Sequence, residues 1–130
     1  AQHPLARAVR PGSLTMSALQ DVAISYLERK GSSIPFWEMA TTSIDELKRR
    51  ADKIYPKYTT ETTATPGGGT LPGVEIPSAG LKFAGDHVKF FRQQNPPIIC
   101  RVDNDQTVID LMTVHPNDDV FIDAAIKKIN

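Results

Sequence analysis

The sequence predicts an α+β domain in which an antiparallel sheet is covered by helices. Three observations lead to this fold class. Helical and extended segments are grouped along the chain instead of alternating, a strand–turn–strand pattern near residues 98–113 makes at least one strand pair antiparallel, and 130 residues are enough for one sizeable core. With 40% hydrophobic and 23% charged residues, the composition is that of a folded globular domain.

Two long helices are predicted in the first half of the chain. Apolar residues recur at helical spacing from Met16 to Leu27, with Ser13 or Thr15 as the N-cap and Gly31 as the stop, so we expect a helix over about residues 13–30. Ser43 and Glu46 form a capping box for a second helix, which ends before Pro56. We expect its outer face to carry four cations, Lys48, Arg49, Arg50 and Lys53. Residues 34–39, between the two helices, predict a short buried helix or turn.

The second half predicts strands, one helix, a hairpin and a last helix. Residues 58–63 favour a strand, and residues 74–76 and 78–83 read as extended segments that Pro77 separates, since proline cannot donate to a central ladder. Asp86 is expected to cap a helix that runs to Gln94. Residues 98–102 and 107–113 flank a polar turn and predict a hairpin. The last helix is expected to begin near Pro116 or Asn117 and to pack through Phe121, Ala124, Ala125 and Ile129.

Charge and cysteine content limit the possible functions. Fifteen basic and fifteen acidic residues give no net charge, which argues against wholesale binding of polyanions. The single Cys100 cannot form an intramolecular disulfide, and no signal peptide or long apolar run is present, so we expect a cytoplasmic protein without a membrane segment. The chain opens on Ala1 without an initiator Met, which suggests a fragment of a longer protein.

Metal binding and nucleophilic catalysis find little support in the sequence. His3, His87 and His115 are scattered singly, and none stands at metal-ligand spacing from another histidine or from Cys100, so no metal site is expected. His115 is interpreted as a helix-entry residue and His87 as a surface residue of a first helical turn. Cys100 is expected in a buried strand as a small hydrophobic side chain.

Three groups of residues are candidates for binding an oxyanion. Arg7 and Arg10 are three residues apart and would share one face of a helix, although a solvated pair explains them equally well. Arg101 lies in an apolar strand, where a charge requires a ligand or an acidic partner such as Asp103 or Asp110. A glycine-rich stretch offers backbone N–H groups, but without a P-loop ending it is also typical of a flexible turn; it comprises Gly67, Gly68, Gly69 and Thr70.

Taken together, three segments resemble bacterial selenocysteine synthase, the L-seryl-tRNA(Sec) selenium transferase family, in its C-terminal third. Residues 3–10 with 14–19 are similar to the segment in which two arginines precede a long helix. Residues 67–78 resemble the family's Gly-Gly-Gly-Ser-Leu-Pro loop and the strand after it. Residues 96–102 with 107–114 resemble its hairpin, and the similarity covers essentially the whole chain in order.

The resemblance implies a fold and a chemistry. The family's members are fold-type-I pyridoxal-phosphate enzymes, and this chain would be their small C-terminal domain, residues 1–130, preceded by an interdomain helix at about 13–30, with the large cofactor domain absent. None of the eight lysines stands in the context of the cofactor lysine, so we expect no catalytic residue here and no activity of this piece alone. The intact enzyme would convert seryl-tRNA(Sec) to selenocysteinyl-tRNA(Sec) with selenophosphate, as a homo-oligomer.

By family match, Arg7 and Arg10 would bind selenophosphate or a similar oxyanion, and Arg101 with residues 67–70 would form the wall of the substrate entrance. Lys48, Arg49, Arg50 and Lys53 would either touch tRNA phosphates or form a solvated helix face. The sequence departs from the family pattern at Pro11-Gly12-Ser13, Cys100 and Met112. A related pyridoxal-phosphate lyase or transferase acting on a small amino compound, or a non-catalytic binding or oligomerisation module, therefore stays open as an alternative.

Overall fold

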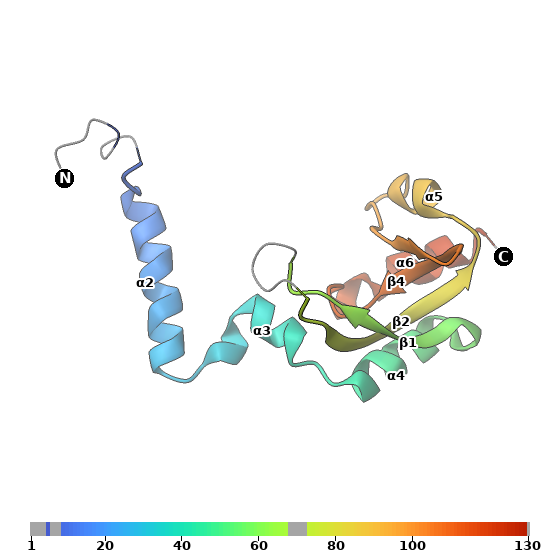
Figure 1. The fold of residues 1–130 in the computed structure, drawn as a ribbon, viewed down its shortest axis with the longest axis horizontal. Helices are drawn as coiled ribbons and strands as arrows, with labels where there is room; N and C mark the ends of the chain where they lie inside the picture. The colour runs from blue at the N-terminus through green and yellow to red at the C-terminus, as the bar shows by residue number, and fades with distance from the viewer. Residues whose placement is uncertain (1–4, 6–8, 68–72, 130) are drawn as a thin grey trace. The chain divides into compact units, whose positions relative to one another are not determined.

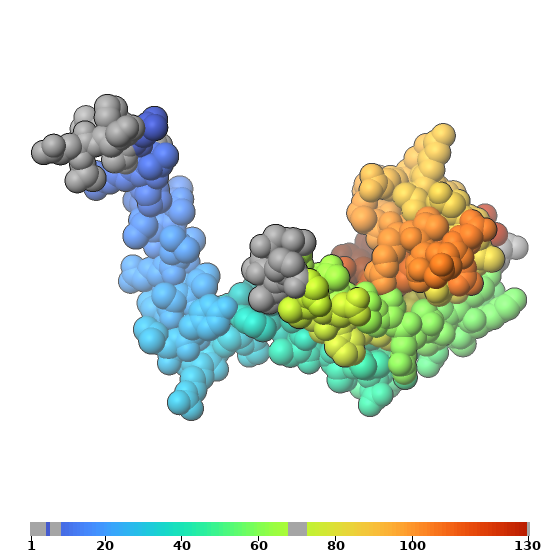
Figure 2. Space-filling view, viewed as in Figure 1, coloured from blue at the N-terminus to red at the C-terminus, as the bar shows by residue number. Residues whose placement is uncertain are grey.

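The computed structural model describes residues 5, 9–67 and 73–129, which form two compact units, residues 1–38 and 39–130. The first unit contains helix α2 (Ser13–Leu27), the 3₁₀ turn η1 (Gly31–Ser33) and most of the short helix α3 (Pro35–Ala40). Among its described residues none is buried, and in Figure 2 the blue-to-cyan segment is a strip one helix thick. The described part of this unit therefore forms no hydrophobic core of its own.

The helix predicted over residues 13–30 is present but shorter. It ends at Leu27, and Arg29 adopts a left-handed backbone conformation (φ 57°), which ends the helix before Gly31. The N-cap is Gly12 and not Ser13 or Thr15, so that prediction was wrong. The predicted burial of residues 34–39 was also wrong for the aromatic pair, because Phe36 and Trp37 are 39% and 38% exposed, and Trp37 Nε1 donates to Tyr26 Oη at 2.6 Å.

The second unit is a four-stranded antiparallel sheet with helices packed on one face (Figure 1). Its elements, in chain order, are α4 (Ile44–Ile54), η2 (Pro56–Tyr58), β1 (Thr59–Ala64), β2 (Ile76–Ala84), α5 (Val88–Arg92), β3 (Arg101–Asp103), β4 (Gln106–Asp110), η3 (Pro116–Asp118) and α6 (Asp119–Ile126). The strand order is β1-β2-β4-β3, and every neighbouring pair is antiparallel. The predicted α+β class is confirmed.

Strand β2 runs through Pro77, which corrects the prediction of two separate extended segments. Pro77 pairs only with Thr63 of β1, because the pairing of β2 with β4 begins at Gly80. The proline therefore lies where β2 has a single neighbour and tolerates the missing N–H. The predicted hairpin is confirmed: Asn104 and Asp105 both have positive φ, 50° and 58°, as the two central residues of a tight β3–β4 turn require.

The core lies between one sheet face and the helices. Alternate residues of β2, namely Ala79, Leu81 and Phe83, meet Leu47 and Ala51 of α4 in one buried cluster. Ser43 caps α4 as predicted, its Oγ accepting from Glu46 N at 3.2 Å. Helix α6 buries Ile122, Ala125 and Ile126, whereas Phe121 is 40% exposed, so the predicted inward face of this helix was partly wrong.

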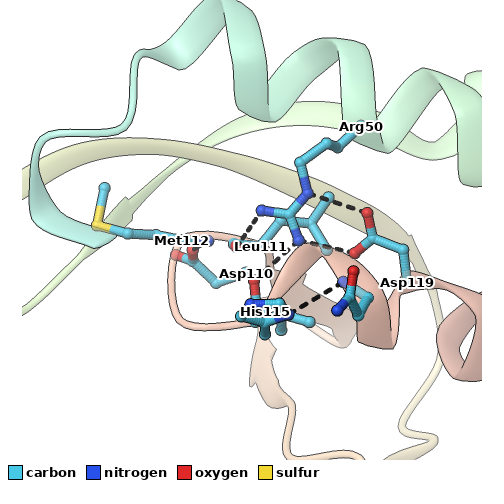
Figure 3. A network of polar contacts seen from close by, with 8 residues as sticks. Arg50, Asp110, Leu111, Met112, His115 and Asp119 are labelled. Carbon is cyan, nitrogen blue, oxygen red and sulfur yellow. Dashed lines mark hydrogen bonds and ion pairs between the residues drawn. The ribbon is translucent and has the colours of Figure 1, made fainter. Parts of the chain in front are cut away.

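The predicted outer face of α4 also needs a correction at Arg50. Its side chain is buried, because residue 50 lies three positions after Leu47 and four before Ile54, on the inward side of the helix. Arg50 donates to both carboxylate oxygens of Asp119, at 2.9 and 2.7 Å, and to the carbonyls of Leu111 and Val114 (Figure 3). The guanidinium thus joins α4, α6 and the chain after β4.

Candidate functional site

The structure describes only some of the residues predicted to bind an oxyanion. Arg7, Gly68, Gly69 and Thr70 lie outside the described residues. Arg10, in the first unit, is exposed. The residue before it, Val9, donates its backbone N–H to the Leu5 carbonyl, as in a helical turn. Gly67 is exposed with φ 119°, a backbone conformation that favours glycine. Arg101, in the second unit, is the candidate with defined side-chain contacts.

Arg101 connects the two outer strands of the sheet. It stands on β3, and its Nη2 donates to the Thr62 side-chain hydroxyl and, at 3.0 Å, to the Thr63 backbone carbonyl of β1. Its Nη1 lies 3.6 Å from Asp110 Oδ2 of β4, an ion pair. The predicted acidic partner is therefore Asp110, whereas Asp103 pairs with Lys82 at 3.1 Å.

Asp110 is itself held in place through its other carboxylate oxygen, Oδ1. Its Oδ1 accepts from Ser78 Oγ at 2.7 Å and from Met112 N at 3.0 Å, and Ser78 is 1% exposed. Gly80, opposite Asp110 in the β2–β4 ladder, lets the backbones of β2 and β4 approach closely, because a Cβ there would lie 2.0 Å from the Ile109 carbonyl oxygen. We call Thr62, Ser78, Arg101 and Asp110 the loop-end cluster, since β1 leads from it towards residues 65–75.

The loop-end cluster borders a shallow groove on the sheet face opposite the core helices. The groove is lined by residues from all four strands: Glu61, Thr62, Thr63, Lys82, Arg101, Val102, Asp103 and Val108. Each of its carboxylates is paired with a cation, Glu61 with Lys48 and Asp103 with Lys82. The Lys48 ammonium lowers the pKa of Glu61 by hydrogen bonding and charge. These pairs leave the groove without a marked excess of positive charge.

The remaining sequence candidates have structural roles. His115 Nδ1 accepts from Asn117 N at 3.2 Å and caps η3, which confirms it as a helix-entry residue. His87 precedes α5, and its ring Nε2 lies 3.0 Å from the Ala84 carbonyl oxygen. Cys100 is half-buried just before β3, and burial raises the pKa of its thiol. It therefore has the character of a packed thiol and not of an activated one.

A second cleft lies between residues 96–99 and the start of α6. Its walls include Pro97, Ile99, Val114, His115 and Phe121. No group of three histidine, cysteine or carboxylate side chains suited to a metal ion occurs in the part of the chain that the structure describes. No helix in the described ranges is long and apolar enough to span a membrane.

Comparison with known proteins adds what the geometry cannot show. A family model described as L-seryl-tRNA selenium transferase matches residues 1–115, almost nine tenths of the chain. The chain belongs to this family. An L-seryl-tRNA(Sec) selenium transferase of Carboxydothermus hydrogenoformans is 33% identical over 87% of the chain, and one of Aquifex aeolicus is 30% identical over 90%. The aligned regions are 28% and 29% of those relatives, so this selenium transferase family chain spans under a third of their length.

Sequence reasoning missed two features of this member of the selenium transferase family. The buried Arg50 could have been found from its i+3 and i−4 spacing to Leu47 and Ile54. The contact of Arg101 with Thr62 and Thr63 could not, because it joins residues 39 and 38 positions apart through the curvature of the sheet. No local pattern encodes such a contact.

Proposed function

We propose that this chain is the small C-terminal domain, with its leading helix, of a pyridoxal-phosphate-dependent L-seryl-tRNA(Sec) selenium transferase. The intact enzyme would convert seryl-tRNA(Sec) to selenocysteinyl-tRNA(Sec) with selenophosphate as donor, in the cytoplasm and as a homo-oligomer. The observation that carries this proposal is the match over residues 1–115, together with relatives of that name more than three times as long as the matched region.

The described residues do not hold the cofactor by themselves. A pyridoxal-phosphate site needs a lysine to bond the aldehyde and walls that enclose the ring. The lysine in the described groove is Lys82, which is paired with Asp103, and the apolar cleft contains no lysine. The cofactor and its lysine would therefore come from the part of the longer protein that this chain does not include.

The exposed apolar surface of α2 supports its role as an interdomain helix. Seven apolar side chains of this fifteen-residue helix are at least 41% exposed: Leu14, Met16, Leu19, Val22, Ile24, Tyr26 and Leu27. A helix with so wide an apolar surface is normally covered by another part of the protein. The large domain of the longer enzyme is the covering surface that the proposal supplies.

In this proposal Arg7 and Arg10 bind the selenophosphate oxyanion, while Arg101 and residues 67–70 form the wall of the substrate entrance. Guanidinium groups suit a tetrahedral oxyanion, because their fixed N–H donors make short charge-assisted hydrogen bonds. The small domain would thereby place positive charge opposite the cofactor, where the incoming selenium donor carries its negative charge.

The direct test is an assay of the full-length protein for selenium transfer to seryl-tRNA(Sec), with selenophosphate as donor. We expect Arg7→Ala/Arg10→Ala to abolish turnover and to leave the absorbance of the bound cofactor intact. Unchanged turnover would refute the assignment of the two arginines. Turnover of a small amino compound, with none of seryl-tRNA(Sec), would instead support the related lyase or transferase.

A further inference from the structure

The Nη2 group of Arg101 donates hydrogen bonds to another strand of the same sheet. Both hydrogen bonds from its Nη2 go to β1, to the Thr62 hydroxyl and the Thr63 carbonyl. Thr63 is opposite Pro77 in the β1–β2 ladder, and because Leu111 N donates to Ala79 O, both Ala79 and Pro77 direct their backbone groups away from β1. Thr63 and Pro77 are thus a non-hydrogen-bonded pair, in which the Thr63 carbonyl faces away from β2. Arg101 therefore gives the end of β1 a hydrogen bond that its neighbouring strand is unable to provide at this position.

The Arg101 guanidinium is also held by its ion pair with Asp110. Asp110 faces its Nη1, and the Asp110 carboxylate is oriented by Ser78 and by the backbone N–H of Met112. Two strands, β2 and β4, thus hold the residue that restrains Arg101, and Arg101 in turn restrains β1. The connection is continuous from the core of the sheet to Thr63, the second-last residue of β1.

The charges nearby do not favour a direct contact between Arg101 and an oxyanion. The Asp110 carboxylate lies beside the guanidinium with only 11% of its side chain exposed, and Asp103 lines the same groove. An approaching dianion would meet these carboxylates as well as the cation. Arg101 is thus better suited to hold protein groups than to hold selenophosphate.

We propose that Arg101 is a positioning residue, which acts on the reaction by fixing the end of β1. It sets the direction in which the chain leaves the sheet after Ala64, and Asp110 keeps it in the required orientation. This inference rests on the proposed function, in which the segment after β1 contributes to the substrate entrance. It refines that proposal by assigning Arg101 to the protein scaffold and not to the oxyanion.

The test compares four variants of the full-length protein: Arg101→Met, Thr62→Val, the double variant, and Thr60→Val as a matched control. Thr60 lies on the same strand and sheet face as Thr62, but its hydroxyl donates to the Glu61 carbonyl, whereas the Thr62 hydroxyl accepts from Arg101. Two quantities are measured, amide hydrogen exchange in a peptide covering residues 62–67 and kcat/KM for selenium transfer.

We expect exchange in that peptide to become about tenfold faster in Arg101→Met, and kcat/KM to fall by about tenfold, as the loss of charge-assisted hydrogen bonds predicts. Thr62→Val should show part of both effects, and the double variant should be no worse than Arg101→Met alone, because both changes break the same connection. Thr60→Val should behave as wild type.

Two results would overturn the inference. Unchanged exchange in Arg101→Met would show that the arginine does not hold β1. A large loss of kcat/KM in Arg101→Met, with wild-type kinetics in Thr62→Val and fully additive effects in the double variant, would assign Arg101 to the substrate. Because exchange is measured without turnover, it decides the scaffold role even if the protein proves to catalyse another reaction.

Discussion

Replacing Arg50 by methionine is expected to destabilise the second unit more than any other single charge removal on α4. Methionine roughly preserves the length of the side chain and removes its positive charge. It leaves the Asp119 carboxylate without its bidentate partner and the Leu111 and Val114 carbonyls without the Arg50 donor (Figure 3). The perturbation therefore tests the link between α4, α6 and the chain after β4.

The size of the expected destabilisation follows from the burial of the Arg50–Asp119 ion pair. Removing one partner of a buried ion pair costs about 3–5 kcal/mol, because the remaining charge is left without compensation. The Arg50 side chain is 8% exposed but that of Asp119 is 20% exposed, so water can partly solvate the carboxylate. We therefore expect a loss near the lower end, about 3 kcal/mol, which is a large part of the 5–15 kcal/mol that stabilises a typical domain.

The assay is urea unfolding followed by far-ultraviolet circular dichroism. This signal is chosen because the single tryptophan, Trp37, belongs to the first unit, whereas most helices and all strands belong to the second. With a slope of about 1–3 kcal/mol per molar urea, a loss of 3 kcal/mol lowers the midpoint by about 1–3 M. The matched control is Arg49→Met, since Arg49 is 69% exposed and pairs with Glu46 on the surface, where such a pair contributes at most about 1 kcal/mol.

A compensating variant sharpens the result. Arg50→Met/Asp119→Leu removes both charges, so it should be more stable than Arg50→Met alone. The reasoning is refuted if Arg50→Met is no more destabilising than Arg49→Met, because the buried network would then contribute no more than a surface pair.

Three further predictions concern other sites. Alkylation of Cys100 by iodoacetamide should reach half its maximal rate at a higher pH in the native chain than in urea, because burial raises the thiol pKa and only the thiolate reacts; coincident profiles would contradict this. Gly80→Ala should lower the free energy of unfolding by at least about 2 kcal/mol, because the added Cβ would collide with the Ile109 carbonyl. Gly31→Ala adds a Cβ that makes only ordinary contacts, so it should lower the free energy of unfolding by less than about 1 kcal/mol. Lys48→Ala should raise the carboxyl pKa of Glu61, measured by NMR titration; an unchanged value would show that the ion pair is not formed in solution.

The elements of the fold could largely be predicted where local chemistry dominates. The capping box at Ser43, the polar turn of the β3–β4 hairpin and the apolar periodicity of α2 are all properties of a few neighbouring residues. Prediction failed at Pro77, because whether proline interrupts a strand depends on how many neighbours the strand has at that position. It was also partly wrong for the inward face of α6, where Ala125 is buried as predicted but Phe121 is 40% exposed.

The candidate site shows the same division. The sequence alone, through its similarity over nearly the whole chain, determined the family and singled out Arg101 as a charge that needs a partner. Only the tertiary structure decided that the partner is Asp110 and that the same guanidinium reaches Thr62 and Thr63. The physical reason is that hydrogen bonds between residues 38 positions apart depend on the register and curvature of the sheet, which the whole fold determines.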